Sequence, residues 1–243
     1  MAGLEVEVVL ANPDRATLRV GDVFLKVDAD SARAAAEVEA MAAVPVPTPT
    51  VLWHRPPVLA LAALRGEALA RADATPAVWA AVGAVVRALH SAPLPARQSP
   101  GTDVLAARLD EECAWLVAEG VLPASVVDRN RRFAERVLRP WTPVCIHGDL
   151  HDEHVFVDGD EVTGIVDWSE AAQGDPLFDL ATLTIGHPDH LDHLLSGYGG
   201  DVDRDLVLAW RSLRCLTALR WLIQSGYGPP ETYPETRILR SAG

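Results

Sequence analysis

Two aspartates stand at the ends of apolar strands in the middle of the chain. Asp149 follows the apolar run Val144–Ile146, in the polar stretch His147–His154, and Asp167 ends a second apolar run 18 residues later. Between them, the turn sequence Asp158–Asp160 is flanked by short apolar runs, which predicts a β-hairpin. Because a hairpin brings the chain back to where it started, both carboxylates are expected at one end of a small sheet. Such a pair can supply one general base and one metal ligand.

Three motifs occur in order around these aspartates. They are His-Gly-Asp at 147–149, Val-Asp-Trp at 166–168 and Gly-Asp-Pro-Leu-Phe-Asp-Leu at 174–180. The set resembles the aminoglycoside phosphotransferase and choline-kinase-like family, in which a catalytic H-G-D loop, a metal-binding Asp after a hairpin and a G-D-P segment follow one another. A lone H-G-D would be weak evidence, whereas three motifs at these separations are specific.

The resemblance implies an α+β, two-lobed protein-kinase-like fold. A small N-terminal lobe with an antiparallel sheet, residues 1–64, would bind the nucleotide. A larger, mainly helical lobe, residues 65–243, would carry catalysis and the acceptor site. Hydrophobic periodicity and turn signals agree with this division. They predict strands at 6–10, 17–20, 23–27, 51–53 and 58–64, and helices at 31–43, 75–90, 103–119, 124–138 and 203–224.

Lys26 is the single lysine among 21 Lys and Arg residues, and it lies in the apolar strand Val23–Val27. Lys is a compact point charge whereas Arg is a wide planar fork, so a lone Lys in an Arg-rich chain indicates a role that Arg cannot fill. By the resemblance, Lys26 holds the α- and β-phosphates of ATP. A Glu of the next helix would orient it, and Glu37 fits the register better than Glu39. The alternative is chance survival on a solvated strand.

The resemblance also places the backbone of Leu61, Ala62 and Ala63 beside the nucleotide base. The first hairpin turn, residues 11–15, has no glycine that would let backbone N–H groups approach phosphates closely. Arg15 could contact phosphate instead, but a solvated turn arginine is the favoured interpretation. A weak grip on phosphate, and modest affinity for ATP, would follow.

Further roles come from the same resemblance. Asp149 is the predicted catalytic base, Asp167 the predicted Mg²⁺ ligand, and His147 and Asp179 are predicted to brace the catalytic loop. The loop position that is usually Asn is His154 here. Its nitrogen suits Mg²⁺ less well than an amide oxygen, which predicts a weakened or Mn²⁺-tolerant second metal site. A His at this position also resembles macrolide phosphotransferases.

The composition of the chain restricts the classes of molecule that it is expected to bind. The net charge of −13 and the pI near 4.9 argue against nucleic acid and suit a cationic small-molecule acceptor, although acidity also serves solubility alone. The apolar runs are too short to cross a bilayer and the N-terminus lacks a signal peptide pattern. Three cysteines without a close-spaced pair indicate reduced thiols and hence a cytoplasmic protein. A monomer or weak homodimer is expected. Candidate acidic contacts to the acceptor are Asp110, Glu111, Glu112, Asp201, Asp203, Asp205, Glu231 and Glu235.

Several functions stay open. The leading hypothesis is an ATP- or GTP-dependent small-molecule O-kinase acting on an aminoglycoside-type antibiotic, that is, a resistance enzyme. A macrolide, choline or a sugar are alternative acceptors, and family resemblance by itself does not choose among them. A nucleotide-binding pseudokinase is the second hypothesis, because of His154 and the glycine-free turn. A metal-dependent phosphoesterase is the third. A metal site at His187–His193 is disfavoured because no partner motif with zinc-type spacing accompanies it.

Overall fold

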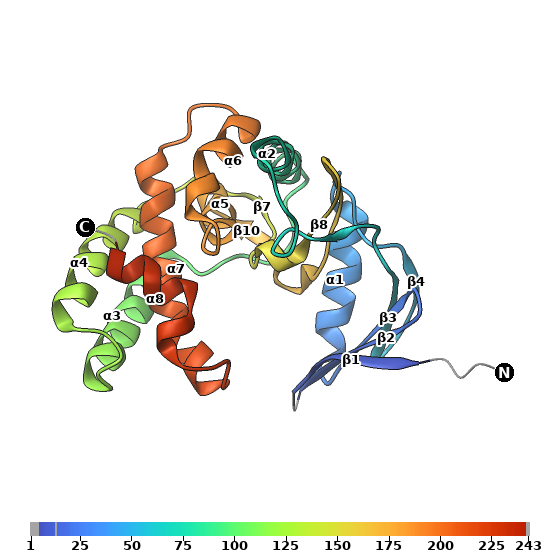
Figure 1. Ribbon diagram of the computed structural model, residues 1–243, viewed down its shortest axis with the longest axis horizontal. Helices are drawn as coiled ribbons and strands as arrows, with labels where there is room; N and C mark the ends of the chain where they lie inside the picture. The colour runs from blue at the N-terminus through green and yellow to red at the C-terminus, as the bar shows by residue number, and fades with distance from the viewer. Residues whose placement is uncertain (1–4, 13, 242–243) are drawn as a thin grey trace.

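The computed structural model describes residues 5–12 and 14–241 (Figure 1). Two parts of the sequence analysis fall outside the described residues. They are residues 1–4, where no signal peptide is expected, and Pro13 in the predicted first turn. The chain forms a small N-terminal part built on a sheet and a larger, mainly helical part. The predicted α+β arrangement is therefore confirmed.

The small lobe contains one antiparallel sheet of five strands in the order β1-β2-β3-β5-β4. The predicted strands are all present; four of them extend further than expected, whereas the strand predicted over 58–64 ends at Ala62. The most useful difference is in the first hairpin, where β2 begins at Arg15 and pairs Arg15 with Asp28. The strands are β1 (Val6–Ala11), β2 (Arg15–Val20), β3 (Val23–Asp28), β4 (Val51–Arg55) and β5 (Val58–Ala62).

Helix α1 (Ser31–Ala43) has the predicted bounds and is capped by Asp30. Its buried residues Ala34 and Glu37 are three apart and so lie on one face. The helix packs against the turn η3 (Trp168–Glu170) of the large lobe, and Figure 1 shows it between the sheet and that lobe. A residue of α1 is thereby brought to the boundary between the lobes.

The large lobe consists of helices around two short sheets, β10-β7 and β6-β8-β9. The helix predicted over 124–138 ends early, because its last turn tightens into η1 (Glu135–Val137). Thr75 caps α2 as its sequence indicates, by accepting the N–H of Val78. The helices are α2 (Pro76–His90), α3 (Thr102–Ala118), α4 (Ala124–Ala134), α5 (Pro176–Leu183), α6 (Leu191–Tyr198), α7 (Arg204–Gln224) and α8 (Pro234–Ser241); the strands are β6 (Glu67–Ala68), β7 (Val144–Ile146), β8 (Val155–Asp158), β9 (Glu161–Ile165) and β10 (Ala172–Gly174).

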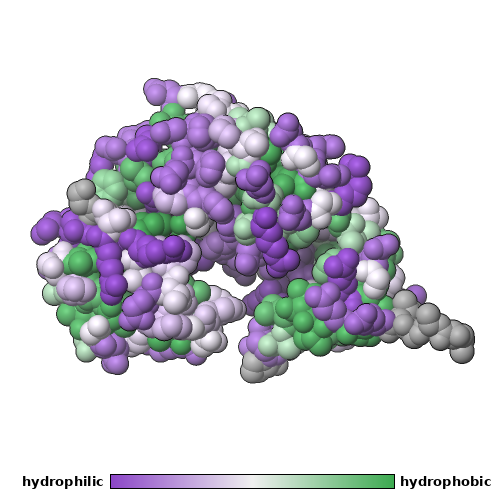
Figure 2. All heavy atoms as spheres, in the orientation of Figure 1, coloured by the Kyte–Doolittle hydropathy of each residue, from purple (hydrophilic) through white to green (hydrophobic). Residues whose placement is uncertain are grey.

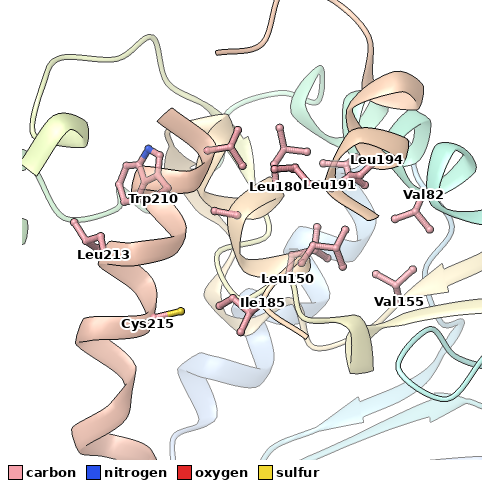
Figure 3. Close-up of a cluster of buried hydrophobic side chains, with 14 of the residues drawn as sticks. Val82, Leu150, Val155, Leu180, Ile185, Leu191, Leu194, Trp210, Leu213 and Cys215 are labelled. Carbon is pink, nitrogen blue, oxygen red and sulfur yellow. The ribbon is translucent and has the colours of Figure 1, made fainter. Parts of the chain in front are cut away.

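The core of the large lobe lies directly under the loop of residues 147–154. Figure 3 shows Leu150 of that loop pointing into a cluster formed by side chains from α2, α5, α6 and α7, and Leu150 is fully buried. Burying a leucine stabilises the fold by about 2 kcal/mol and here also fixes the loop that carries Asp149. Among the described residues, no helix is long and apolar enough to cross a membrane.

Candidate active site

The loop after β7 is held from below by Asp179. This carboxylate is completely buried and accepts the backbone N–H of His147 at 2.8 Å and that of Gly148 at 3.1 Å. His90 reaches the same carboxylate at 3.1 Å. Gly148 has a φ of +82°, and a Cβ there would lie 2.3 Å from the carbonyl oxygen of Glu170. Only glycine therefore fits this turn.

The ring of His147 ties the loop to the hairpin that follows. Its Nε2 donates to the carbonyl oxygen of Val166 at 3.0 Å, and its Nδ1 accepts the N–H of Asp149 at 3.3 Å. Both bonds require the neutral ring, since Nδ1 must keep its lone pair. Complete burial lowers the pKa of His147, although the charge of Asp179 raises it in part. The lowered pKa agrees with a neutral ring. The ring is thus a spacer between Asp149 and the strand that leads to Asp167.

Asp167 follows the predicted hairpin of β8 and β9, in which Val155 pairs with Ile165. It has a φ of +64° and a ψ of +60°, a left-handed conformation that costs a non-glycine residue about 1–2 kcal/mol. Asp tolerates it better than most residues. Trp168, also fully buried, donates to the carbonyl oxygen of Ile165 at 2.7 Å and holds the turn. The strained backbone turns the Asp167 carboxylate toward the small lobe.

Lys26 joins the two lobes at this carboxylate. Its Nζ lies 2.7 Å from both Glu37 oxygens and 2.9 Å from Oδ1 of Asp167. Of the two candidates for a Lys26 partner, the structure places Glu37 there, while Glu39 is exposed on another face of α1. Residues from β3, from α1 and from the segment after β9 therefore meet in one ion-paired group.

The prediction that Arg15 is a solvated turn residue is wrong. Its side chain is only 17% exposed, because β2 starts at this residue and directs it into the site. Its Nη1 lies 3.4 Å from Oδ2 of Asp167. Burial favours the neutral form of Asp167, but Lys26, His154 and Arg15 outweigh it and lower the pKa of Asp167 to about 2.

Asp149 is held by two groups that the sequence analysis did not name. Its Oδ1 lies 3.2 Å from Nε2 of His151 and 3.3 Å from Nη2 of Arg214 in α7. Burial would raise the pKa of Asp149, yet His151, Arg214 and His154 together lower it well below its usual range. Oδ2 makes no hydrogen bond to any described residue. One oxygen is therefore anchored, and the other is available to an incoming hydroxyl.

His154 stands between the two carboxylates. Its Nδ1 lies 2.7 Å from the carbonyl oxygen of Asp149, so this nitrogen must carry the proton. Its Nε2 lies 3.8 Å from Oδ2 of Asp167. In the neutral ring Nε2 carries a lone pair, and it faces the same space as the Asp167 carboxylate. The two side chains can therefore share one cation.

The space-filling view in Figure 2 shows a deep hollow between the two lobes, lined by hydrophilic residues.

The predicted base-binding strand β5 belongs to the small lobe. Leu61 is buried there, and the N–H groups of Ala62 and Ala63 already donate to the carbonyls of Thr50 and Asp22. A base contact by Ala62 or Ala63 would therefore have to use a carbonyl group.

Two histidines of the segment His187–His193, where a metal site is disfavoured, contact structural neighbours. His190 stacks on Trp79 at 5.0 Å between ring centroids, and His187 bonds Asp152 at 2.8 Å. Most acidic candidates for the acceptor also have structural roles. Asp110 pairs with Arg131, Glu111 with Arg220 and Asp205 with Arg136; Asp203 caps α7, and Glu235 is buried. Glu112 is different, because one of its oxygens is buried with no hydrogen-bond partner among the described residues.

A comparison with known protein families matches residues 3–216 to the model of the phosphotransferase enzyme family. The chain belongs to this family. The viomycin phosphotransferase of Streptomyces vinaceus is 33% identical over 103 residues, which are 38% of this chain and 36% of that protein. At the level of the family, the prediction of a small-molecule kinase is confirmed.

Solved structures agree on the fold of this phosphotransferase family member. The crystal structure of a choline/ethanolamine kinase family protein from Mesorhizobium loti aligns with a TM-score of 0.73 at 24% identity, over 98% of this chain and 87% of that chain. The GDP and kanamycin complex of APH(2")-IIia aligns with a TM-score of 0.74 at 16% identity, over 98% and 93% of the two chains. The two-lobed kinase-like fold is thereby confirmed.

Proposed function

We propose that the protein transfers the γ-phosphate of ATP or GTP to a hydroxyl group of a cationic small molecule, foremost an aminoglycoside-type antibiotic. The observation that carries this proposal is the ion-paired group of Lys26, Glu37 and Asp167, which joins both lobes beside the loop of Asp149. The GDP bound by one structural neighbour supports a nucleotide in the hollow between the lobes.

Phosphoryl transfer asks the protein chiefly to position reactants and to neutralise charge. Lys26, oriented by Glu37, would hold the α- and β-phosphates. The free Oδ2 of Asp149 would accept the proton of the acceptor hydroxyl and align its oxygen with the γ-phosphorus, while His151 and Arg214 keep Oδ1 in place. The low pKa of Asp149 keeps it ionised throughout the neutral range.

The residues present fit a divalent cation that is shared with phosphate. Asp167 offers a carboxylate and His154 a lone pair 3.8 Å away. In the described part of the chain, no group of three or more His, Cys, Asp or Glu could hold a metal by itself. Phosphate oxygens would thus complete the coordination, which is the usual arrangement for Mg²⁺. When bound, the ion neutralises charge on the phosphates.

The proposed class of acceptor is supported by the net charge of the protein and by the names of similar proteins. A net charge of −13 attracts cations to the protein. Among the acidic candidates, Asp201 and Glu231 are exposed and their carboxylates pair with no described residue, and one oxygen of Glu112 in α3 has no hydrogen-bond partner among the described residues. Viomycin phosphotransferase and the kanamycin complex are the relatives whose names point to an acceptor. Kanamycin and viomycin are therefore the first acceptors to test.

The test is nucleotide turnover with Mg²⁺ and either ATP or GTP, against kanamycin, viomycin, a macrolide, choline and simple sugars. Asp149→Asn runs beside the wild type. Asp152→Asn is the matched control, because Asp152 lies in the same loop but bonds His187. Turnover that requires one acceptor, disappears in Asp149→Asn and survives in Asp152→Asn would establish the proposal. Nucleotide binding without turnover on any acceptor would favour the pseudokinase instead.

A further inference from the structure

Arg15 and Lys26 project from the same face of the small-lobe sheet. Thr17 of β2 is directly opposite Lys26 of β3, and Arg15 is directly opposite Asp28. Side chains at paired positions, and at positions two apart, share one face of an antiparallel sheet. Arg15 is therefore placed next to Lys26 by strand register. The two cations hold the two oxygens of Asp167, Lys26 on Oδ1 at 2.9 Å and Arg15 on Oδ2 at 3.4 Å.

The guanidinium of Arg15 is anchored on its other side. Its Nε lies 3.5 Å from Oδ2 of Asp28, whose own Oδ1 accepts the N–H of Asp30 at 2.9 Å. Asp28 is thus fixed by the backbone at the start of α1. Because the guanidinium is planar and rigid, an anchored Nε leaves Nη1 directed into the site. The side chain is already in place for a ligand, and little conformational entropy would be lost on binding.

The backbone of the first turn is not available for the same task. Asn12 Oδ1 accepts the N–H of Asp14 at 3.0 Å and that of Arg15 at 2.8 Å. The N–H of Asn12 donates to the carbonyl oxygen of Arg15 at 2.9 Å. Each backbone N–H among the described residues 12, 14 and 15 is therefore satisfied inside the turn. A glycine-rich loop would present such groups to phosphate, and this turn does not.

We propose that Arg15 is a phosphate-binding residue, and that its guanidinium takes the place of the backbone amides of a glycine-rich loop. The inference rests on the proposed function, since it needs a nucleotide in the hollow between the lobes. The phosphates of the nucleotide, with their divalent cation at Asp167, replace that carboxylate as the partner of Arg15. Asp28 keeps the other edge of the guanidinium fixed during the exchange. Arg15 and Lys26 then contact the phosphates from neighbouring strands.

Calorimetric titration with nucleotide and Mg²⁺, in the absence of any acceptor, tests this directly. Arg15→Ala is compared with Arg33→Ala. Arg33 also pairs with Asp28, at 3.7 Å, but its side chain is 43% exposed. The control therefore loses an ion pair to the same carboxylate without losing a group in the site. A hydrogen bond to a charged group contributes about 1.5–3 kcal/mol, so Arg15→Ala is expected to weaken ATP binding at least tenfold.

The loss of affinity in Arg15→Ala should increase with the number of phosphate groups on the nucleotide. It is expected to be largest for ATP, smaller for ADP and absent for AMP, and Arg33→Ala should match the wild type for all three. Equal affinity of Arg15→Ala and Arg33→Ala for ATP, or an equal loss for ATP and AMP, would overturn the role of Arg15. If Arg15→Ala does not fold, Arg15→Gln, which keeps the aliphatic stem, is used in its place. A wild-type protein that binds none of the nucleotides would refute the proposed function itself.

Discussion

The surroundings of Asp167 and Asp149 differ in origin, although charge keeps both carboxylates ionised against burial. Asp167 is held by Lys26 and Arg15, which two paired strands of the small lobe supply. Asp149 is held by His151 of its own loop and by Arg214 of α7, in the large lobe. The side of the site proposed to bind nucleotide thus depends on strand register, and the side proposed to bind the acceptor depends on how a helix packs. Substitutions on the two sides should have separable effects on nucleotide and acceptor.

The largest effect is expected on the nucleotide side. Lys26→Met removes the charge that is proposed to hold the phosphates and leaves Glu37 buried without a partner, so turnover should fall by about 10²–10³-fold. Lys26→Arg should remain severely impaired, because a wide fork cannot replace the point charge between Glu37 and Asp167. Steady-state kinetics with each substrate varied would check this. An increase in the acceptor KM equal to that for nucleotide would break the comparison.

A smaller effect is expected on the acceptor side. Arg214→Gln should lower kcat/KM for the acceptor about tenfold, a fraction of the ~10²–10⁴ that a positioned base contributes. Arg214 lowers the pKa of Asp149, so its removal raises that pKa and moves the acidic limb of the pH–rate profile to higher pH.

The control for Arg214→Gln lies on the same helix. Arg204 pairs with Asp192 at 2.8 Å, so Arg204→Gln should leave the pH profile unchanged. Affinity for ATP, measured without acceptor, should be the same in all three proteins. A loss of ATP affinity in Arg214→Gln would show that the two sides are not separable.

The acid stability of the metal-free protein sharpens the comparison further. The pKa of Asp167 is about 2, below its ordinary value of 3.8, so its contribution is fully present above pH 4 and is lost as the pH falls toward 2. Asn tolerates the left-handed backbone nearly as well as Asp, so Asp167→Asn removes little but charge. Allowing for partial exposure, the free energy of unfolding should drop by about 1–2 kcal/mol at pH 7. Denaturant unfolding in a chelator should show this difference shrinking toward pH 2, whereas a difference independent of pH would contradict the assignment.

The smallest effect is expected at His154, which lies between the two sides. His154→Asn replaces a nitrogen donor with an amide oxygen, so turnover should shift from tolerating Mn²⁺ toward preferring Mg²⁺ by several-fold. Turnover measured over a range of each metal ion would give this ratio. If the ratio is the same in wild type and variant, His154 does not face the metal.

The sequence determined the parts of the site that depend on local geometry. Turn residues and strand patterns placed Asp149 before a hairpin and Asp167 after it, and helix register favoured Glu37 over Glu39. His147 and Asp179 came instead from the family resemblance, and the structure brings them together, since Asp179 accepts the backbone N–H of His147. The hairpin and the register of Glu37 could be predicted from the residues because each needs only the periodicity of one element, or a turn between two neighbouring ones.

Only the tertiary structure decided which cations reach the carboxylates. Arg15 looked like a solvated turn residue until the start of β2 turned it inward. Arg204, Arg211, Arg214 and Arg220 are alike in the sequence of α7, yet Arg214 alone bonds Asp149 among these four. Sequence periodicity fixes the face of an element on which a side chain lies. The residue that a side chain contacts is set by how elements far apart in the chain pack together, and that packing also sets the charge around Asp149 and Asp167.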